Sequence, residues 1–396
     1  MEATNTSFMR KSLSMAFAVA FASATFFLGG CSSEPKERVD AAIVVQNTQN
    51  APTWDETVLN DCIAQVRASG GKVTVTIADS NPSSVTFDFA EEAGSQLNQD
   101  RLERKLHEAL KQEADDPGVD VLKSIEVGAE SIAGSENALG VFVISSGIAD
   151  TGLLQMATSN LVEADAVQVA DFYEAKHELP DLAWVKTVTW YGLGATAGAQ
   201  GAPSNAQQAS IQALYQAVLE KCGTSLSVQN RAVARPEPRE GNLPAVQVVE
   251  FAPAVAYVPP VDANDADAAS TVEFSSTQLG FVGDGVEFTD PDQAAEALGT
   301  IADQLKANPH LMATVTCSAA SFPWKEGYSQ KLSERRAAAV CAALRDMGVD
   351  ESQLTSLGIG NGGNTDDIDP ETGLQDPQKA AEKRKTVIEL HTTTEA

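Results

Sequence analysis

The stretch SQKLSERRAAAVCAALRDMGV, residues 329–349, predicts a helix that packs on a domain and holds an arginine at the edge of the contact. Its apolar residues recur at helical spacing, and Gly348 is typical of a helix C-terminus. Arg335 lies almost opposite the apolar stripe, where solvation explains its charge. Arg336 lies at the edge of the stripe, one turn from Leu332. A guanidinium in that place can bind a carboxylate through two parallel hydrogen bonds.

The residues around this helix predict one domain, at 271–392. Asp290 followed by Pro291 is typical of a helix start, because the aspartate caps the helix and proline fits its first position. MATVTCS (312–318) and KRKTVIEL (383–390) read as strands. The order predicts a β-α-β-α-β core with a further helix and strand.

This segment resembles the OmpA C-terminal domain-like family, and LSERRA (332–337) is the most specific part of the match. The usual ligand of that family is peptidoglycan, whose diaminopimelate residue is clamped by an arginine and an aspartate. Arg336 matches the arginine. Ser321 stands at the position of the aspartate, and Ser329 at the position of an asparagine. The peptidoglycan site that the resemblance implies contains Arg336, Ser321, Leu332, Ser333 and Ser329.

A serine in place of the aspartate removes the charge that would hold the ammonium group of the ligand. Losing one charge-assisted hydrogen bond costs about 1.5–3 kcal/mol, roughly ten- to a hundredfold in affinity. Two explanations fit. Either the ligand is a different wall polymer, docked through Arg336, or the domain keeps only its fold. The insert Phe322–Lys325 (FPWK) supports a sugar or peptide ligand, although such a tryptophan also anchors loops.

The N-terminus predicts export and lipidation. Arg10 and Lys11 precede an uncharged apolar run that ends in LGGC at Cys31, which resembles the lipobox of a bacterial lipoprotein. We therefore expect residues 1–30 to be a signal peptide, Cys31 to carry palmitate, and residues 31–40 to form a tether. The alternative is a plain signal peptide. The expected location is the extracytoplasmic face of the cell membrane.

Composition limits the partners. The formal net charge of the 396-residue chain is −28, which argues against nucleic acid and against electrostatic binding to anionic lipids. The four histidines are scattered, and no phosphate loop or zinc spacing is present. The sequence therefore predicts a protein that is not an enzyme and has no cofactor.

Residues 41–224 alternate between strand and helix patterns, which predicts a doubly wound, mostly parallel sheet. DSNP (79–82), ISSGIADTG (144–152) and WYGLG (190–194) make this part similar to the von Willebrand factor A-type fold, and more specifically to the N-terminal domain of some actinobacterial OmpA-family lipoproteins. The partner of this vWA-like domain is unknown.

Such folds often carry a metal site of Asp-x-Ser-x-Ser plus a threonine and an aspartate. Here the first strand leads into QNTQNAP (46–52), which has no carboxylate, so we expect no metal. Asn47, Gln49 and Asp79 are candidates for binding a partner, and ordinary turn chemistry explains them equally well.

Besides the lipidated Cys31, four cysteines would remain after signal cleavage, an even number that favours disulfides in an oxidising compartment. Cys62 and Cys222 are on the inward stripes of the first and last α/β helices, which predicts one bond. Cys317 and Cys341, at a strand end and on the helix over it, predict another. Buried free thiols are the alternative.

Composition indicates the character of two further stretches. Residues 225–270 are rich in Pro, Asp and Ala and predict a linker, with VQVVEF and AVAYV as possible short strands. The acidic run 366–371 lacks the spacing of a calcium loop and predicts a solvated loop.

The sequence thus predicts a lipid-anchored envelope protein whose C-terminal domain binds the peptidoglycan stem peptide. The alternative is a protein-interaction lipoprotein that works through its N-terminal domain and whose C-terminal domain has lost wall binding.

Overall fold

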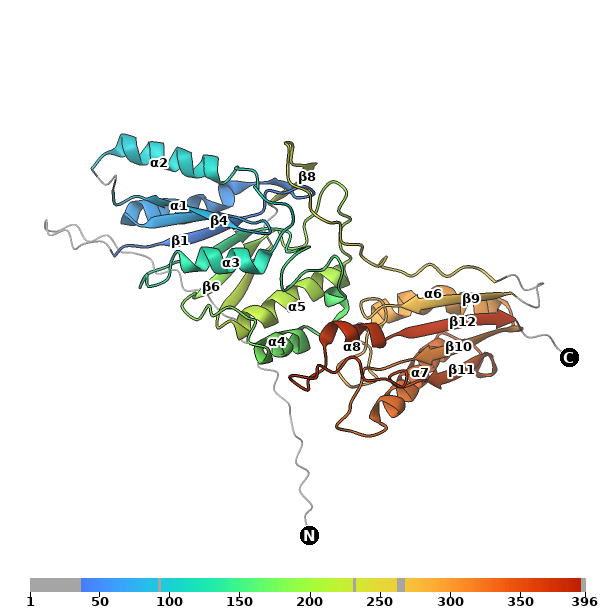
Figure 1. Cartoon of the computed structure of the whole chain (residues 1–396). Coiled ribbons are helices and arrows are strands. Elements are labelled where there is room, and N and C mark those ends of the chain that lie inside the picture. Colours follow the sequence, from blue (N-terminus) through green and yellow to red (C-terminus); the bar gives the residue numbers. More distant parts are fainter. Residues whose placement is uncertain (1–36, 92–93, 231–232, 262–267, 393–396) are drawn as a thin grey trace, which may run out of the picture. The chain divides into compact units, whose positions relative to one another are not determined.

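The structure is a computed structural model that describes residues 37–91, 94–230, 233–261 and 268–392 (Figure 1). The predicted signal peptide and Cys31 lie outside the described residues. Among the described residues, no helix combines the length and apolar character needed to cross a membrane.

The N-terminal part is built on a six-stranded sheet with the order β4-β3-β1-β5-β6-β7. All neighbouring strands are parallel except β3 and β4, which form an antiparallel hairpin. The strands are β1 (Ala41–Val45), β3 (Lys72–Ile77), β4 (Ser83–Asp88), β5 (Val141–Ile144), β6 (Thr187–Tyr191) and β7 (Ser225–Gln229). The helices are α1 (Asn60–Ser69), α2 (Gln96–Ala109), α3 (Val121–Glu130), α4 (Ala166–Ala175) and α5 (Asn205–Lys221), with short 3-10 turns η1 (Glu56–Leu59) and η2 (Leu161–Glu163).

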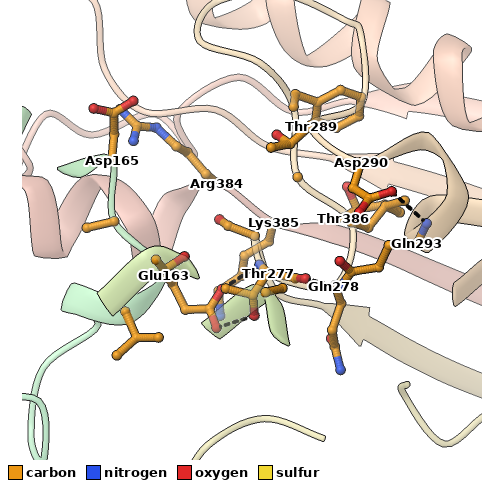
Figure 2. A pocket seen from close by; sticks show the side chains of 18 of the residues that line it. Glu163, Asp165, Thr277, Gln278, Thr289, Asp290, Gln293, Arg384, Lys385 and Thr386 are labelled. Atoms are coloured by element: carbon orange, nitrogen blue, oxygen red, sulfur yellow. Dashed lines mark hydrogen bonds between the residues drawn. The ribbon is translucent and has the colours of Figure 1, made fainter. Parts of the chain in front are cut away.

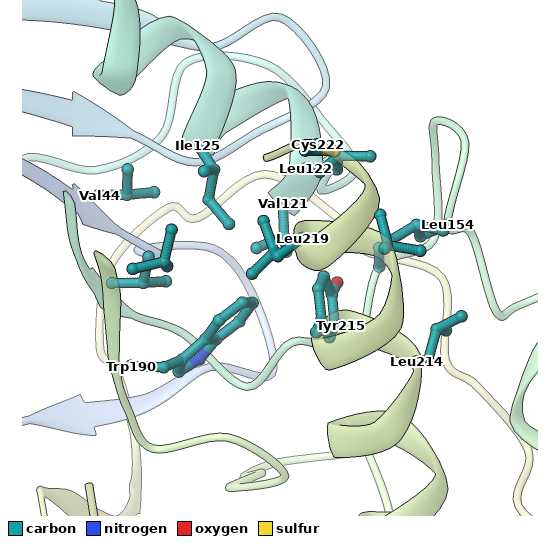
Figure 3. Close-up of a cluster of buried hydrophobic side chains, with 14 of the residues drawn as sticks. Val44, Val121, Leu122, Ile125, Leu154, Trp190, Leu214, Tyr215, Leu219 and Cys222 are labelled. Carbon is teal, nitrogen blue, oxygen red and sulfur yellow. The ribbon is translucent and has the colours of Figure 1, made fainter. Parts of the chain in front are cut away.

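Helices cover both faces of this sheet because the central strand buries both sets of its side chains. Ile43 and Val45 pack with α1 and α2 in one cluster. Val44 points to the other face and belongs to a cluster with α3 and α5, which Figure 3 shows around Trp190 and Tyr215. Residues of α4 belong to the same cluster. A parallel sheet covered on both faces is what the predicted strand–helix alternation requires.

The predicted linker is structured at its start. Ser225–Gln229 form β7, the sixth strand of the sheet. Further along, β8 (Ala234–Pro238) pairs antiparallel with β2 (Pro52–Trp54). Val258 is buried in the C-terminal core. The linker prediction is therefore wrong for Ser225–Gln229 and Ala234–Pro238, whose short strands show no apolar periodicity. VQVVEF and AVAYV, which the sequence offered as short strands, form none.

The C-terminal part is a four-stranded sheet with the order β11-β10-β12-β9. Its elements follow the predicted order and are β9 (Ala269–Phe274), α6 (Pro291–Ala307), β10 (Leu311–Cys317), α7 (Tyr328–Asp346), η3 (Glu351–Gln353), β11 (Leu354–Gly358), α8 (Pro377–Lys383) and β12 (Thr386–Thr392). The predicted cap is confirmed: the Asp290 carboxylate accepts hydrogen bonds from the backbone of Asp292 and Gln293, and Pro291 is the first residue of α6.

Candidate functional site

Arg336 is buried on the inner side of α7, with 6% of its surface exposed. Its Nε donates to the carbonyl oxygen of Gly285 at 3.1 Å and its terminal nitrogen to that of Gly283 at 2.6 Å. The guanidinium also lies 4.9 Å from the centroid of the Phe281 ring. Backbone carbonyls and the Phe281 ring therefore hold the side chain in one orientation. The sequence predicts Arg336 at the edge of the apolar stripe, whereas the structure places it on the buried side of the helix.

A second arginine, the half-buried Arg384, follows α8, and the sequence alone gives no signal for it as a site residue. It donates to the Oε1 atoms of Gln375 at 3.0 Å and Gln168 at 2.6 Å. Burial, and after it the positive charge of Arg384, lower the pKa of Arg336 to about 10. Among the described residues, no carboxylate lies within 4.0 Å of either guanidinium.

Both arginines line a cavity of about 560 Å³ (Figure 2). Of the four carboxylates in its lining, Glu163, Asp165 and Asp290 accept hydrogen bonds, and Asp284 is exposed. Glu163 accepts from the backbone and hydroxyl of Thr277, both at 2.7 Å. Asp165 and Asp290 cap the starts of α4 and α6. The charges of Asp284 and Asp165 act on the guanidiniums from beyond ion-pair distance. The guanidiniums still present donors with no carboxylate bound to them, and such donors suit an anionic ligand.

Ser321 is fully buried and does not line this cavity. Its backbone N–H donates to Oδ2 of Asp367 at 2.7 Å, and its hydroxyl donates to Oδ1 of the same carboxylate. Lys383 places its ammonium 2.8 Å from that Oδ1. A carboxylate thus lies beside Ser321 after all, but it is supplied from residue 367 and is already paired with a lysine.

Burial opposes ionisation of Asp367, yet the hydrogen bonds from Lys383 and Ser321 outweigh it and lower the pKa of the carboxyl group. Asp367 is fully buried. The prediction that residues 366–371 form a solvated loop is therefore wrong for this residue. A ligand ammonium finds no free carboxylate here, because Lys383 takes that place.

The remaining predicted site residues are not gathered around the cavity. Leu332 is a buried apolar residue, and the Ser333 hydroxyl accepts a hydrogen bond from the backbone of Gly360 at 2.9 Å. Ser329 donates to the carbonyl oxygen of Ala320 at 2.9 Å. Of the five predicted residues, the structure places only Arg336 in the cavity lining.

The aromatic insert lies beside a smaller hollow lined by Phe322, Lys325 and Ser329 among others. Trp324 is 63% exposed and meets the Phe322 ring edge-on. The Lys325 ammonium lies 3.4 Å from the centroid of the Tyr328 ring. The insert therefore presents an exposed indole on a loop held by its neighbours.

At the carboxyl edge of the N-terminal sheet, an amide occupies the crevice between β1 and β5. Gln46 Oε1 accepts hydrogen bonds from the hydroxyls of Ser145 at 2.8 Å and Ser146 at 3.0 Å. The Asn47 amide donates to the carbonyl oxygens of Leu110 and Gln112, and Gln49 donates through its backbone to Pro244. Nowhere in the described parts of the chain do three or more His, Cys, Asp or Glu side chains gather as metal ligands.

Asp79 serves the turn chemistry that was one of its two interpretations. Its carboxylate accepts hydrogen bonds from the backbone of Asn81 at 2.9 Å and of Asp115 and Asp116 at 3.2 Å. The side chain is 1% exposed. It therefore closes two loops rather than facing a partner.

The predicted disulfides are absent, since the four cysteines of the described residues are free thiols. Cys62 packs in the cluster on the α1 face and Cys222 in the cluster on the α5 face. The sheet separates them, and a disulfide needs Cα atoms less than about 7 Å apart. Cys317 and Cys341 share one core, where the Cys317 sulfur lies 3.4 Å from the Thr386 hydroxyl.

We expect these thiols to react slowly in the native chain. Burial raises the pKa of Cys62 and of Cys222 to about 12 and that of Cys341 to about 11, so little thiolate forms near neutral pH. In a chain lacking residues 1–36, four thiols should react with a disulfide reagent when the chain is unfolded in guanidinium without reductant. Far fewer should react in the folded chain. Two or four missing thiols in guanidinium would contradict the free state.

Comparison with known proteins identifies the class of the C-terminal domain. Residues 281–380 match the model of the OmpA family, so the chain carries an OmpA-family domain in this region. No curated protein sequence matches the chain.

Solved structures similar to the chain include the periplasmic domain of Helicobacter pylori MotB, with 18% identity, 35% of this chain and 83% of that chain covered, and a TM-score of 0.26. The peptidoglycan-associated lipoprotein from Burkholderia pseudomallei shares 21% identity over 28% of this chain and 88% of that chain, with a TM-score of 0.24. The OmpA-like domain of FopA1 from Francisella tularensis shares 19% identity over 36% and 86%, with a TM-score of 0.25.

Proposed function

We propose that this chain is a lipid-anchored cell-envelope protein whose OmpA-family domain binds a carboxylate of the peptidoglycan stem peptide. The observation that carries the proposal is a pair of guanidiniums, the buried Arg336 and the half-buried Arg384, which line one cavity with no carboxylate within 4.0 Å among the described residues. Burying a charge is costly unless a counter-charge comes with it, so such a pair is best explained by an anion that arrives as ligand.

The proposed ligand is a simple carboxylate rather than a group that presents a carboxylate and an ammonium together. Arg336 supplies the carboxylate half of the site. On the other half, the Asp367 carboxylate is buried and held by Lys383, so it gains nothing from a ligand ammonium. Lysine keeps the side-chain ammonium of diaminopimelate and lacks its side-chain carboxylate. We propose that the carboxylate bound is one that both stem peptides carry, so we expect the domain to bind walls of the two types about equally well.

Sedimentation of the full chain with purified peptidoglycan of the two types tests this proposal. Comparable binding to both types supports recognition of the carboxylate alone. Binding to the diaminopimelate type only would show that the site binds the side-chain carboxylate that lysine lacks, since both residues carry the ammonium. Binding to neither type would remove the proposed function.

We further propose that the N-terminal part is a vWA-type domain without a metal. The strand order, with one antiparallel edge strand, supports this fold. The Gln46 amide at the carboxyl ends of β1 and β5 supports the proposal that no metal binds there.

We expect Cys31 to carry the lipid. In a bacterial host fed a labelled palmitate analogue, the wild-type chain should be labelled and sediment with membranes. Cys31→Ser should lose the label, because serine has no thiol to carry the acyl chain. Cys62→Ser is the matched control and should keep the label. Label retained in Cys31→Ser would contradict the prediction.

A further inference from the structure

Residues 244–252, called the strap below, cross the carboxyl edge of the N-terminal sheet as an extended segment without strand or helix. The backbone N–H groups of Gln49 and Gly118 donate to the strap at the carbonyl oxygens of Pro244 and Ala245, at 3.1 and 2.8 Å. Gln49 follows β1, and Gly118 precedes α3. The strap is thus held by the loops of the edge and not by strand pairing.

Three side chains of the domain hold the backbone of the strap. Asp150 accepts from the Gln247 N–H at 2.6 Å. Gln200 binds both backbone groups of Val249, accepting from its N–H at 2.8 Å and donating to its carbonyl oxygen at 2.9 Å. Gln207 donates to the carbonyl oxygen of Ala252 at 2.8 Å.

These contacts read main chain rather than side chains, which is how proteins bind extended peptides of varied sequence. An amide that binds the N–H and the carbonyl of one residue fits only a backbone in the extended conformation. The edge therefore supplies the backbone hydrogen bonds that a peptide-binding site needs.

Specificity comes from one side chain. Val249 is 4% exposed and belongs to the core cluster of the α5 face, while Gln247 and Glu250 on either side point to solvent. Val246 and Phe251 are half buried against the same cluster. The edge thus accepts one apolar residue of the size of valine as an anchor.

The strap also covers the part of the sheet where ligands of such folds bind. In open α/β sheets this is the carboxyl edge at the point where the strand order reverses. Here it lies at β1, whose neighbours are β3 on one side and β5 on the other. The loops after β1 and β5 are those that contribute Gln49 and Asp150.

We propose that this edge is a binding site for an extended polypeptide with a β-branched apolar anchor, and that the strap occupies it in cis. A partner polypeptide of that chemistry takes the place of the strap and is held by Gln200, Gln207, Asp150 and the Val249 anchor site. The proposal is independent of wall binding by the C-terminal domain.

The test uses the full chain with residues 244–252 replaced by a Gly/Ser segment of equal length, and a second full chain carrying Val249→Asp. Val255→Asp, at an exposed position beyond the strap, is the matched control. The probe is a fluorescent peptide with the sequence of residues 242–254, and its anisotropy is measured against each chain. A second peptide carries aspartate in place of the anchor valine.

We expect saturable binding of the wild-type peptide to both unmasked chains, and at least tenfold weaker binding to the wild-type and Val255→Asp chains, whose sites are occupied. The aspartate peptide should not bind. The proposal is overturned if folded unmasked chains fail to bind the peptide, or if they bind both peptides equally. Unfolding of both unmasked chains, seen by circular dichroism, would also overturn it, because the strap would then be an integral part of the fold.

Discussion

Arg336→Ala is expected to weaken binding of the full chain to purified peptidoglycan by about ten- to a hundredfold, which corresponds to one charge-assisted contact of about 1.5–3 kcal/mol. The guanidinium is oriented before the ligand arrives, since Gly283 and Gly285 hold two of its nitrogens. Pre-orientation means that little entropy is lost on binding, so the contact should be near the upper part of that range. Sedimentation with increasing amounts of wall measures the change.

Arg335→Ala is the matched control, because Arg335 is the exposed neighbour on the same helix and carries the same charge. A general electrostatic attraction to the wall would make the two variants equally weak, and would contradict a site at Arg336. Arg336→Lys should fall between wild type and Arg336→Ala, since lysine keeps the charge but not the planar fork.

The half of the candidate site that the sequence predicted is the half encoded locally. Arg336 belongs to a periodic helix with a recognisable motif, and Asp290 and Pro291 mark a helix start by rules that act over a few residues. The hairpin of β3 and β4 was predictable for the same reason. Local spacing therefore predicted the helix, its cap and an arginine beside the buried stripe.

The other half depends on contacts between distant residues. Ser321 meets Asp367 across 46 positions, and neither position shows a local signal. The three consecutive cations Lys383, Arg384 and Lys385 at a strand start were the available hint that this loop faces buried acids. The wrong Cys62–Cys222 pair has a similar origin, because helix stripes show which side chains are buried but not on which face of the sheet.

Asp367→Asn is expected to destabilise the C-terminal site by about 2–4 kcal/mol, between the loss of one charged hydrogen bond and the breaking of a fully buried ion pair. Both oxygens of Asp367 act as acceptors, Oδ2 for the Ser321 N–H and Oδ1 for Lys383 and the Ser321 hydroxyl. An asparagine offers one acceptor only, so its NH₂ group must face a donor in either orientation. Hydrogen exchange at the Ser321 amide should be roughly thirty- to a thousandfold faster in the variant.

The pH dependence distinguishes this explanation from simple misfit. The folded-state pKa of Asp367 is lowered, so its contribution is complete above the ordinary carboxyl pKa of 3.8 and is lost as the pH falls through the lower value. The difference in exchange between wild type and Asp367→Asn should therefore be full at pH 6 and shrink towards pH 3. Asp366→Asn is the control, because Asp366 contacts the same lysine from an exposed position and should change exchange little. A difference that stays constant down to pH 3 would mean that the charge of Asp367 does not hold the loop, and that Lys383 does not close the ammonium side of the site by pairing with it.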